Sequence, residues 1–232
     1  MSFFNCTKPI LCRKKNVNVL DYQDLEGLLK IRLQIGNKIL FSNFYTCIDR
    51  ACLVWGLICA IIFLTAQFSP ISWVTQAIVW SILTLAGSIL TIAITLFWVK
   101  IEKLRWVLYS WITLMVAGAI LTDLGIFLGW GQILMNLCHL WLALCAVGYL
   151  CTGLGLRSRA FLISSLLHVV GIFLLPYCGE WQFLATGLLM AANLLVFAEV
   201  QWDMRSPIEY ALLTEEQKAF NRKQHKLRQT IS

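Results

Sequence analysis

Five polar side chains stand within long apolar stretches of this 232-residue chain. Inside a bilayer such groups are costly, so they are candidates for a functional site by default. A carboxylate and two imidazoles can carry protons, and imidazole nitrogens also bind metals. The candidates are Asp123, Asn136, His139, His168 and Asn193.

Three interpretations of these residues are open. The favoured one is hydrogen bonding between helices, which contributes about 0.6 kcal/mol per bond on average. The second is a path for a proton or a small solute, with Asp123 near its mouth and His139 and His168 as relay groups. The third is a metal ion or a b-type haem held between His139 and His168, because such a site needs two imidazoles at one depth on separate helices. Counting residues from the outer helix ends predicts that both histidines lie about 12 Å deep.

Motifs of common enzyme classes are absent from the sequence, which contains no HExxH, GxSxG, Walker or GxGxxG pattern. Ser164 and His168 stand one turn apart on a single predicted helix. A serine hydroxyl in that position commonly bonds a carbonyl of the preceding turn instead of acting as a nucleophile. We therefore expect no catalytic residue and no bound cofactor.

The elements that position these residues are predicted to be membrane-spanning helices. The chain is 59% hydrophobic and only 13% charged, whereas about a quarter of the residues in soluble domains are charged. A span needs about 20 apolar residues. The sequence predicts an all-α bundle of six spans in three hairpins, at residues 48–68, 73–99, 104–128, 133–153, 160–175 and 181–200. This domain (48–200) lies between an N-terminal segment (1–47) and a C-terminal tail (201–232).

All nineteen Lys and Arg residues fall on one side of this predicted topology, and the turns 69–72, 129–132 and 176–181 contain none. Positive charge is retained on the cytoplasmic side during insertion, so both termini are expected in the cytoplasm. The net charge of +7 is expected to meet anionic lipid headgroups and not nucleic acid. The predicted location is a cytoplasmic or energy-transducing membrane.

Small and hydroxyl-bearing residues recur at three- and four-residue steps along the predicted second span. Such stripes indicate where helices touch in lipid. The favoured interpretation is close packing, and the alternative is a hydroxyl-lined solute path. The stripe consists of Ser81, Thr84, Ser88, Thr91 and Thr95.

The segment 21–46 is amphipathic and has two interpretations. A helix lying on the membrane surface is favoured, with Leu25, Leu28 and Leu29 on its apolar face. The alternative is a β-hairpin, because apolar and polar residues alternate from Leu29 onward and Gly36-Asn37 then follows.

The C-terminal tail is expected to form a short basic helix after Pro207. Thr214 and Gln217 have the spacing of a capping box at its start. The helix is predicted to face the membrane or a partner subunit with Lys218, Arg222, Lys223, Lys226 and Arg228.

The connections between spans are too short to form a soluble site. The sequence therefore favours an accessory, assembly or scaffold subunit of a membrane complex. A small solute or proton transporter that uses Asp123, His139 and His168 is the alternative.

Overall fold

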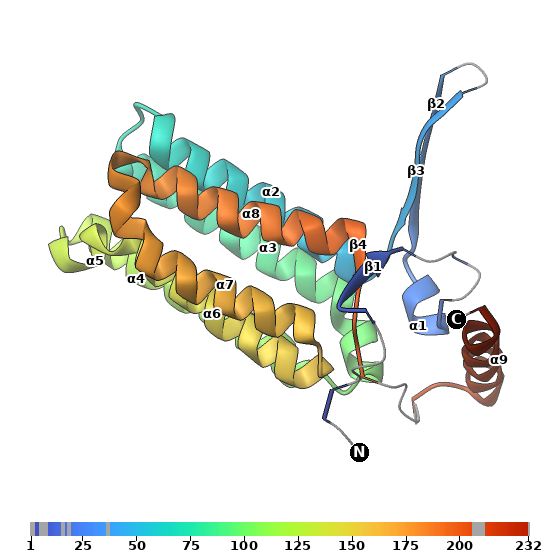
Figure 1. The fold of residues 1–232 in the computed structure, drawn as a ribbon. Helices are drawn as coiled ribbons and strands as arrows, with labels where there is room; N and C mark the ends of the chain where they lie inside the picture. The colour runs from blue at the N-terminus through green and yellow to red at the C-terminus, as the bar shows by residue number, and fades with distance from the viewer. Residues whose placement is uncertain are drawn as a thin grey trace.

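The computed structural model describes residues 3–4, 9–14, 17, 20–35, 38–205 and 212–231. In this part of the chain, six long helices run side by side (Figure 1). Helix α2 packs against α3 and α8, α4 packs against α3 and α6, and α7 packs against α6. The helices are α2 (Cys47–Phe68), α3 (Trp73–Ile101), α4 (Arg105–Phe127), α6 (Leu137–Leu156), α7 (Arg159–Leu174) and α8 (Gln182–Glu199).

Among the described residues, five helical stretches are long and apolar enough to cross a membrane. Four are α2, α3, α4 and α6, and the fifth is the 41-residue stretch Arg159–Glu199. This last stretch contains α7, the 3-10 helix η2 (Leu175–Trp181) and α8. The chain turns at Gly179, whose φ of 53° lies in the left-handed region that favours glycine. Helices α7 and α8 therefore lie beside one another as separate helices (Figure 1).

The bundle is apolar outside and carries polar groups inside. Leu57, Ile89 and Phe173 are 60%, 67% and 71% exposed, whereas His168 and Thr186 are fully buried. Water-soluble monomers rarely expose broad apolar surfaces. Lipid tails accept such surfaces, and helices in lipid associate through close packing and internal hydrogen bonds. The described helices therefore have the surface of a multi-pass membrane protein.

Three helices repeat the pattern Trp-x6-Gly-x3-Thr, at residues 80–91, 111–122 and 141–152. In each repeat, a tryptophan of the neighbouring helix packs against the glycine and donates its indole N–H to the threonine hydroxyl. The donor–acceptor pairs are Trp55 with Thr91 at 2.8 Å, Trp111 with Thr152 at 2.8 Å, and Trp141 with Thr122 at 3.2 Å.

The hydroxyl stripe of α3 serves this packing. Thr84, Ser88 and Thr95 are buried. The Ser88 and Thr95 hydroxyls donate to carbonyl oxygens four residues earlier in the same helix. Their hydroxyl hydrogens are therefore satisfied locally, as the packing interpretation requires.

The predicted fourth span starts four residues before the corresponding helix, α6, in the structure. The prediction was 133–153, but the short helix α5 (Gly131–Met135) ends before α6 starts at Leu137. Asn136 lies between them with φ −112° and ψ 19°, outside the helical range. The other five predicted spans agree with the helices to within two residues at each end.

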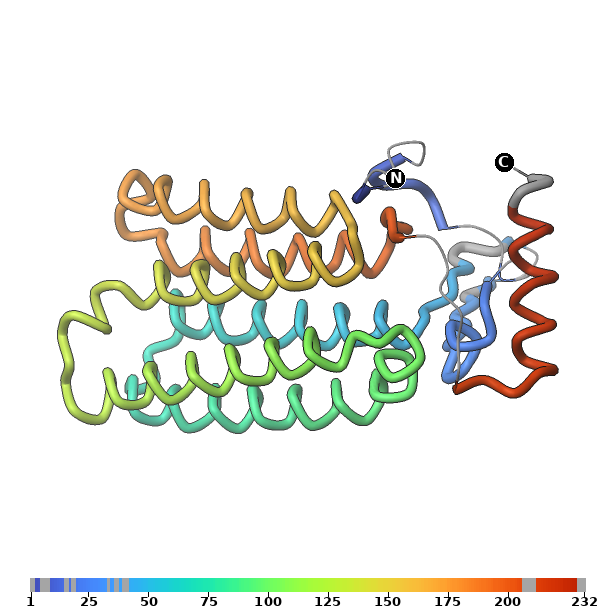
Figure 2. Tube along the Cα trace, turned by 90° about the horizontal axis from the view of Figure 1, so that it is seen from below, coloured from blue at the N-terminus to red at the C-terminus, as the bar shows by residue number. Residues whose placement is uncertain are grey.

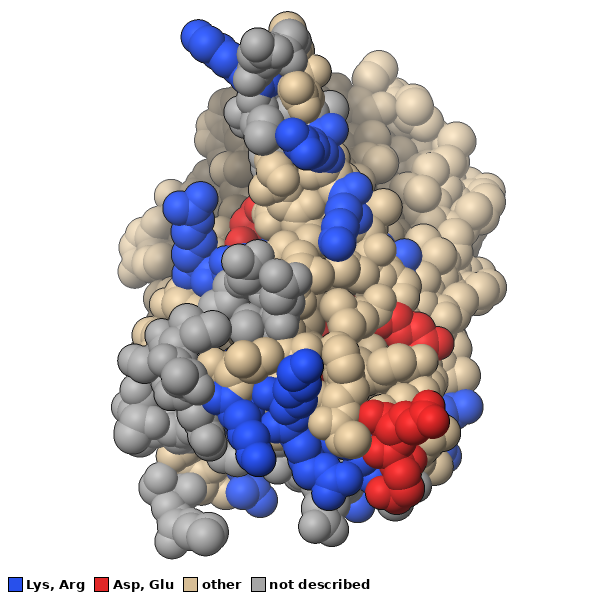
Figure 3. Space-filling model, turned by 90° about the vertical axis from the view of Figure 1, so that its right-hand side faces the viewer, with Lys and Arg blue, Asp and Glu red and all other residues tan. Residues whose placement is uncertain are grey.

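The basic connections and the described parts of both terminal segments lie at one end of the bundle, here called the basic end (Figure 1). Strand β1 (Leu11–Arg13) pairs antiparallel with β4 (Val200–Trp202), which directly follows α8. Lys and Arg side chains are spread over this end when it faces the viewer (Figure 3). The charge segregation predicted from the sequence is therefore present in three dimensions.

The favoured prediction of a surface helix in the segment 21–46 is wrong. Only Tyr22–Leu25 forms a short helix, α1, and strands β2 (Leu29–Ile35) and β3 (Lys38–Tyr45) form an antiparallel hairpin. Apolar and polar residues alternate along β2, and a period of two places them on opposite faces of a strand. The Gly36-Asn37 pair lies outside the described residues. The hairpin extends away from the bundle, across the direction of the helices (Figure 1).

The predicted C-terminal helix is present as α9 (Glu215–Ile231). Its capping box forms as expected, because Gln217 N–H donates to the Thr214 hydroxyl and Thr214 N–H donates to the Gln217 side chain. Pro207 lies outside the described residues. Figure 2 shows α9 running across the bundle at the basic end, beside the N-terminal segment.

Candidate functional site

Asp123 is bonded to the neighbouring helix. The Ser81 hydroxyl of α3 donates to Asp123 Oδ2 of α4 at 2.7 Å. The other carboxyl oxygen, Oδ1, is buried and has no hydrogen-bond partner among the described residues. A buried polar atom without a partner is uncommon in proteins and invites a functional explanation.

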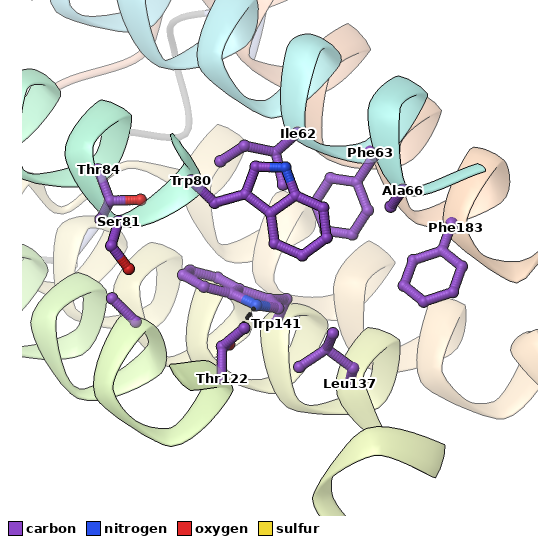
Figure 4. Close-up of a pocket in the computed structure, with 11 residues that line it drawn as sticks. Ile62, Phe63, Ala66, Trp80, Ser81, Thr84, Thr122, Leu137, Trp141 and Phe183 are labelled. Atoms are coloured by element: carbon purple, nitrogen blue, oxygen red, sulfur yellow. Dashed lines mark hydrogen bonds between the residues drawn. The ribbon is translucent and has the colours of Figure 1, made fainter. Parts of the chain in front are cut away.

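A small cavity lies next to this pair. The indoles of Trp80 and Trp141 face each other across it, with Ser81 and Thr84 on one side and Thr122 on the other (Figure 4). Its volume is about 20 Å³, and one water molecule needs about 10–15 Å³. The cavity therefore has room for a single water molecule and not for an organic solute.

A second polar cluster joins α6, α7 and α8. The Ser164 hydroxyl donates to Asn193 Oδ1 at 2.9 Å. His168 is fully buried, and its Nδ1 lies 2.8 Å from the Ser164 carbonyl oxygen. The Tyr149 ring packs on the imidazole, with ring centroids 4.9 Å apart. His168 Nε2 and Asn193 Nδ2 are buried without a partner in the described part of the chain.

The structure separates the two histidines that were predicted to share one depth. His168 packs against Tyr149, and His139 precedes Tyr149 by ten residues on α6, which is about 15 Å along a helix. The prediction was wrong because α6 begins only two residues before His139. A haem or metal ion needs both imidazoles at one point, so these two residues do not fit such a group.

The remaining two candidates, Asn136 and His139, form no hydrogen bond to another long helix among the described residues. Asn136 is exposed and donates to the Gln132 carbonyl oxygen at 2.9 Å, within the outer turn. His139 is half-buried, and its Nδ1 has no partner among the described residues. No hydrogen bond joins Asp123, His139 and His168 within the described residues, so the structure does not assemble these three residues into one site.

The structure contains a buried polar network at the basic end that was not predicted from the sequence. Gln23 of α1 donates to the Glu102 carboxylate at 3.0 Å and accepts from the Asn221 amide of α9 at 3.0 Å. All three side chains are almost fully buried. The Arg205 guanidinium donates to the Glu102 carbonyl oxygen and to the Glu102 carboxylate. This clasp joins α1, the end of α3, α9 and the segment after β4.

The clasp also uses the basic tail. Arg228 and His225 of α9 both contact Asp21, which is 5% exposed. Lys218 and Arg222 contact Glu215 within α9, at 2.9 and 4.0 Å. Arg222, Lys223 and Lys226 lie on the exposed side of the helix. One face of α9 is therefore occupied by the chain's own N-terminal segment, and the other faces outward.

Asp24 of α1 lies beside the clasp, on the side of Trp98. It accepts a hydrogen bond from Trp98 Nε1 at 2.8 Å. Removal from water raises the pKa of Asp24 to about 7, although the bond from Trp98 favours the carboxylate. The nearby Asp21 and Glu102 carboxylates also raise this pKa. Asp24 therefore titrates in the physiological pH range.

Asp203 caps the start of α7. Its carboxylate accepts the Ser158 hydroxyl, the Arg159 side chain and the backbone N–H groups of Arg159 and Ala160, all within 3.1 Å. Burial alone would raise the pKa of Asp203, but these donors outweigh it and hold the pKa below its ordinary value. Asp203 also forms an ion pair with Arg159, at 2.8 Å.

These features define the class of protein: a helical chain with several apolar helices of membrane-spanning length and a folded polar cap at one end. Comparison with protein-family models, curated proteins and solved structures finds no match. The functional argument therefore rests on the chain's own residues.

Proposed function

We propose that the chain is a six-span membrane protein with both termini in the cytoplasm. It serves as an accessory or scaffold subunit of a membrane complex, in a cytoplasmic or energy-transducing membrane. Separate helices α7 and α8 support the count of six, and the position of the basic residues supports the orientation. No catalytic role is proposed.

The β2–β3 hairpin is the observation that carries the scaffold proposal. Both of its outer edges are unpaired among the described strands. An isolated hairpin is only marginally stable, and an unpaired edge is a template for another strand. Leu29 and Ile35 on one face are 44% and 71% exposed. The hairpin is therefore suited to bind a segment of a neighbouring subunit.

The chemistry of that partner follows from the hairpin's charges. Lys30, Arg32 and Lys38 are exposed and none forms an ion pair with a described residue. The preferred partner is an acidic cytoplasmic segment that adds a strand to one edge. The outward side of α9, with Arg222, Lys223 and Lys226, is a second region for this partner or for anionic headgroups.

Purification from the native membrane in mild detergent tests the scaffold role. The wild-type chain should co-purify with a stoichiometric membrane subunit, and Ile35→Lys should release it because the apolar hairpin face is interrupted. Leu227→Lys places the same charge on a 39% exposed residue of α9 and should keep the partner. A monomeric wild type, or an Ile35→Lys variant that keeps the partner, contradicts the proposal.

Thiol labelling tests the topology separately. An impermeant reagent applied to intact cells should reach Cys178 in η2 and should label Cys12 in β1 only after permeabilisation. Cys6, which lies outside the described residues, is expected to behave like Cys12. Labelling of Cys12 in intact cells would reverse the orientation.

Proton or small-solute transport is the second candidate function. It is favoured by the partnerless buried atoms Asp123 Oδ1, His168 Nε2 and Asn193 Nδ2, because such groups mark transport pathways in membranes. Proteoliposomes with a pH-sensitive dye distinguish the two functions. Proton flux that is lost in His168→Gln would establish transport, and no flux above protein-free vesicles would eliminate proton transport.

A further inference from the structure

We propose that the turn between α3 and α4 binds the phosphate group of an anionic phospholipid. This inference rests on the membrane insertion proposed above, but it does not require the partner subunit. Lys100, Lys103 and Arg105 line a hollow of about 390 Å³ at the basic end, together with Trp106 and Leu212. Three cations around one hollow create a strong local preference for an anion.

Among the described residues, several cations at this end are paired with carboxylates, and the three of the hollow are not. Lys14, Arg159, Arg205 and Arg228 each form an ion pair with a carboxylate. The three cations of the hollow have no such pair with any described residue. Their positive charge therefore remains available to a ligand.

Glu102 is the carboxylate nearest in sequence, and it does not neutralise the hollow. Its side chain turns inward into the clasp, where it is 1% exposed and accepts a hydrogen bond from Gln23. Arg205 also contacts it from within the clasp. Glu102 therefore stands between Lys100 and Lys103 in the sequence but serves the interior of the protein.

The backbone at Lys103 adds an independent observation. Leu104 N–H donates to the Val99 carbonyl oxygen at 2.8 Å, and Lys103 N–H donates to the Lys100 carbonyl oxygen at 3.3 Å. This is the Schellman ending of a helix, in which the residue with positive φ is usually glycine. Lys103 occupies that position with φ 55°, which costs a non-glycine residue about 1 kcal/mol. The backbone alone would favour glycine here, so the turn itself does not account for the lysine.

The N-terminus of α4 also favours an anion at the hollow. Arg105 is its first residue, and the helix has no side-chain cap. Unpaired N–H groups and the helix dipole at such a start favour a bound anion. They add to the three cationic side chains of the hollow.

The apolar lining indicates a lipid and not free phosphate. Trp106 is 47% exposed and Leu212 is 65% exposed. Tryptophan is enriched at the level of lipid headgroups, where its ring can contact the glycerol and upper acyl region while the cations hold the phosphate. Free phosphate would use only the charged half of the site.

Purified full-length protein in a neutral detergent tests the site with three probes. These are short-chain phosphatidylglycerol, short-chain phosphatidylcholine and inorganic phosphate, each titrated against thermal stability. The wild type should be stabilised by phosphatidylglycerol at far lower concentrations than by the other two probes. The effect should weaken with added salt, because ionic attraction is screened.

Two glycine variants provide a matched comparison. Lys103→Gly removes a cation from the hollow and relieves the positive φ, so it should fold at least as stably as the wild type. Arg157 ends α6 in the same way with φ 51° at the same end, but it does not line the hollow. We expect Lys103→Gly to weaken phosphatidylglycerol binding about tenfold, as the loss of one charge-assisted hydrogen bond implies. Arg157→Gly should leave it unchanged.

The outcomes separate the alternatives. Equal losses in Lys103→Gly and Arg157→Gly would reduce the effect to general surface charge and overturn the site. Unchanged binding in Lys103→Gly, Lys100→Gln and Arg105→Gln would do the same. Phosphate binding as tight as phosphatidylglycerol binding would overturn the lipid assignment. A partner subunit that still co-purifies with Lys103→Gly keeps the scaffold proposal independent of this result.

Discussion

Trp141 of α6 donates its indole N–H to the Thr122 hydroxyl of α4, and its ring lies over Gly118 one turn before that threonine. Trp111 of α4 makes the reciprocal contact with Thr152 and Gly148 of α6. The two helices therefore exchange the same contact in both directions. The absence of a side chain at each glycine lets the indole approach, and the threonine then satisfies its N–H in a medium without water.

This reciprocal contact predicts a steep response to a single methyl group. A Cβ atom at Gly148 would lie 2.6–2.7 Å from three atoms of the rigid Trp111 ring, so Gly148→Ala should cost about 1–3 kcal/mol. Thr152→Val removes the bond from Trp111 and the bond that the Thr152 hydroxyl donates to the Gly148 carbonyl oxygen, and should cost about 1 kcal/mol at about 0.6 kcal/mol per bond. Gly131→Ala, where no atom lies within 4 Å of the new Cβ, is the neutral control. Thermal unfolding in detergent measures all three, and a neutral Gly148→Ala variant would contradict the packing.

Asp123 should tolerate an uncharged isostere. Asn keeps an oxygen that can accept the Ser81 hydroxyl, so Asp123→Asn should change the free energy of unfolding by less than about 0.5 kcal/mol. Asp123→Leu removes the acceptor and should cost about 1–2 kcal/mol, near the upper range for hydrogen bonds in membranes. If both variants are equally unstable, the charge itself is required and the transport interpretation gains support.

Asp203 should make the start of α7 sensitive to acid. Its folded pKa is held below the ordinary carboxyl value, so its stabilising effect is complete above about pH 4 and is lost as the pH falls through the folded pKa. Asp203→Asn should cost about 2 kcal/mol at pH 7, the scale of hydrogen bonds to a charged group. The thermal midpoints of wild type and variant should converge as the pH is lowered toward 2. A constant difference across that range would disprove the linkage.

Asp24 should act in the opposite sense. Its pKa is raised to about 7, so the folded protein binds its proton more tightly, and stability falls as the pH rises from about 4 to above 7. Asp24→Asn removes the cost of ionisation and still offers an oxygen to Trp98. The variant should therefore have a higher thermal midpoint than the wild type at pH 8 and the same midpoint near pH 4. An equal midpoint at pH 8 would mean that Asp24 is not desolvated.

The helical framework could be predicted because each span is defined by its own local composition. Residues 48–68 and 73–99 were predicted within two residues of α2 and α3. The hairpin was only the alternative prediction because the apolar residues of 25–40 fit a helical face as well as a strand. Strand β2 is stabilised as a strand by its pairing with β3. Because β3 lies in the same ambiguous segment, the sequence offers no separate evidence for that pairing.

The clasp could not be predicted from spacing. Gln23 and Asn221 are ordinary polar residues in the sequence, and nothing near either of them indicates a partner on the opposite terminal segment. The histidines were misplaced for a related reason, since a depth counted from a predicted helix end carries the error of that end. The Trp-x6-Gly-x3-Thr repeat, in contrast, is a local pattern that is visible in the sequence.

The clasp has a consequence for the order of biosynthesis. Gln23 and Asn221 are 198 residues apart, and chains are made from the N-terminus onward. The N-terminal segment therefore waits, with Gln23 still lacking the Asn221 amide and Asp21 still lacking Arg228, until α9 has left the ribosome. A chain that stops early would display these unmatched polar groups at the membrane surface. The closed clasp thus shows that α9 has been made and has docked, and the open clasp is the feature by which protein quality control would recognise a chain cut short before α9.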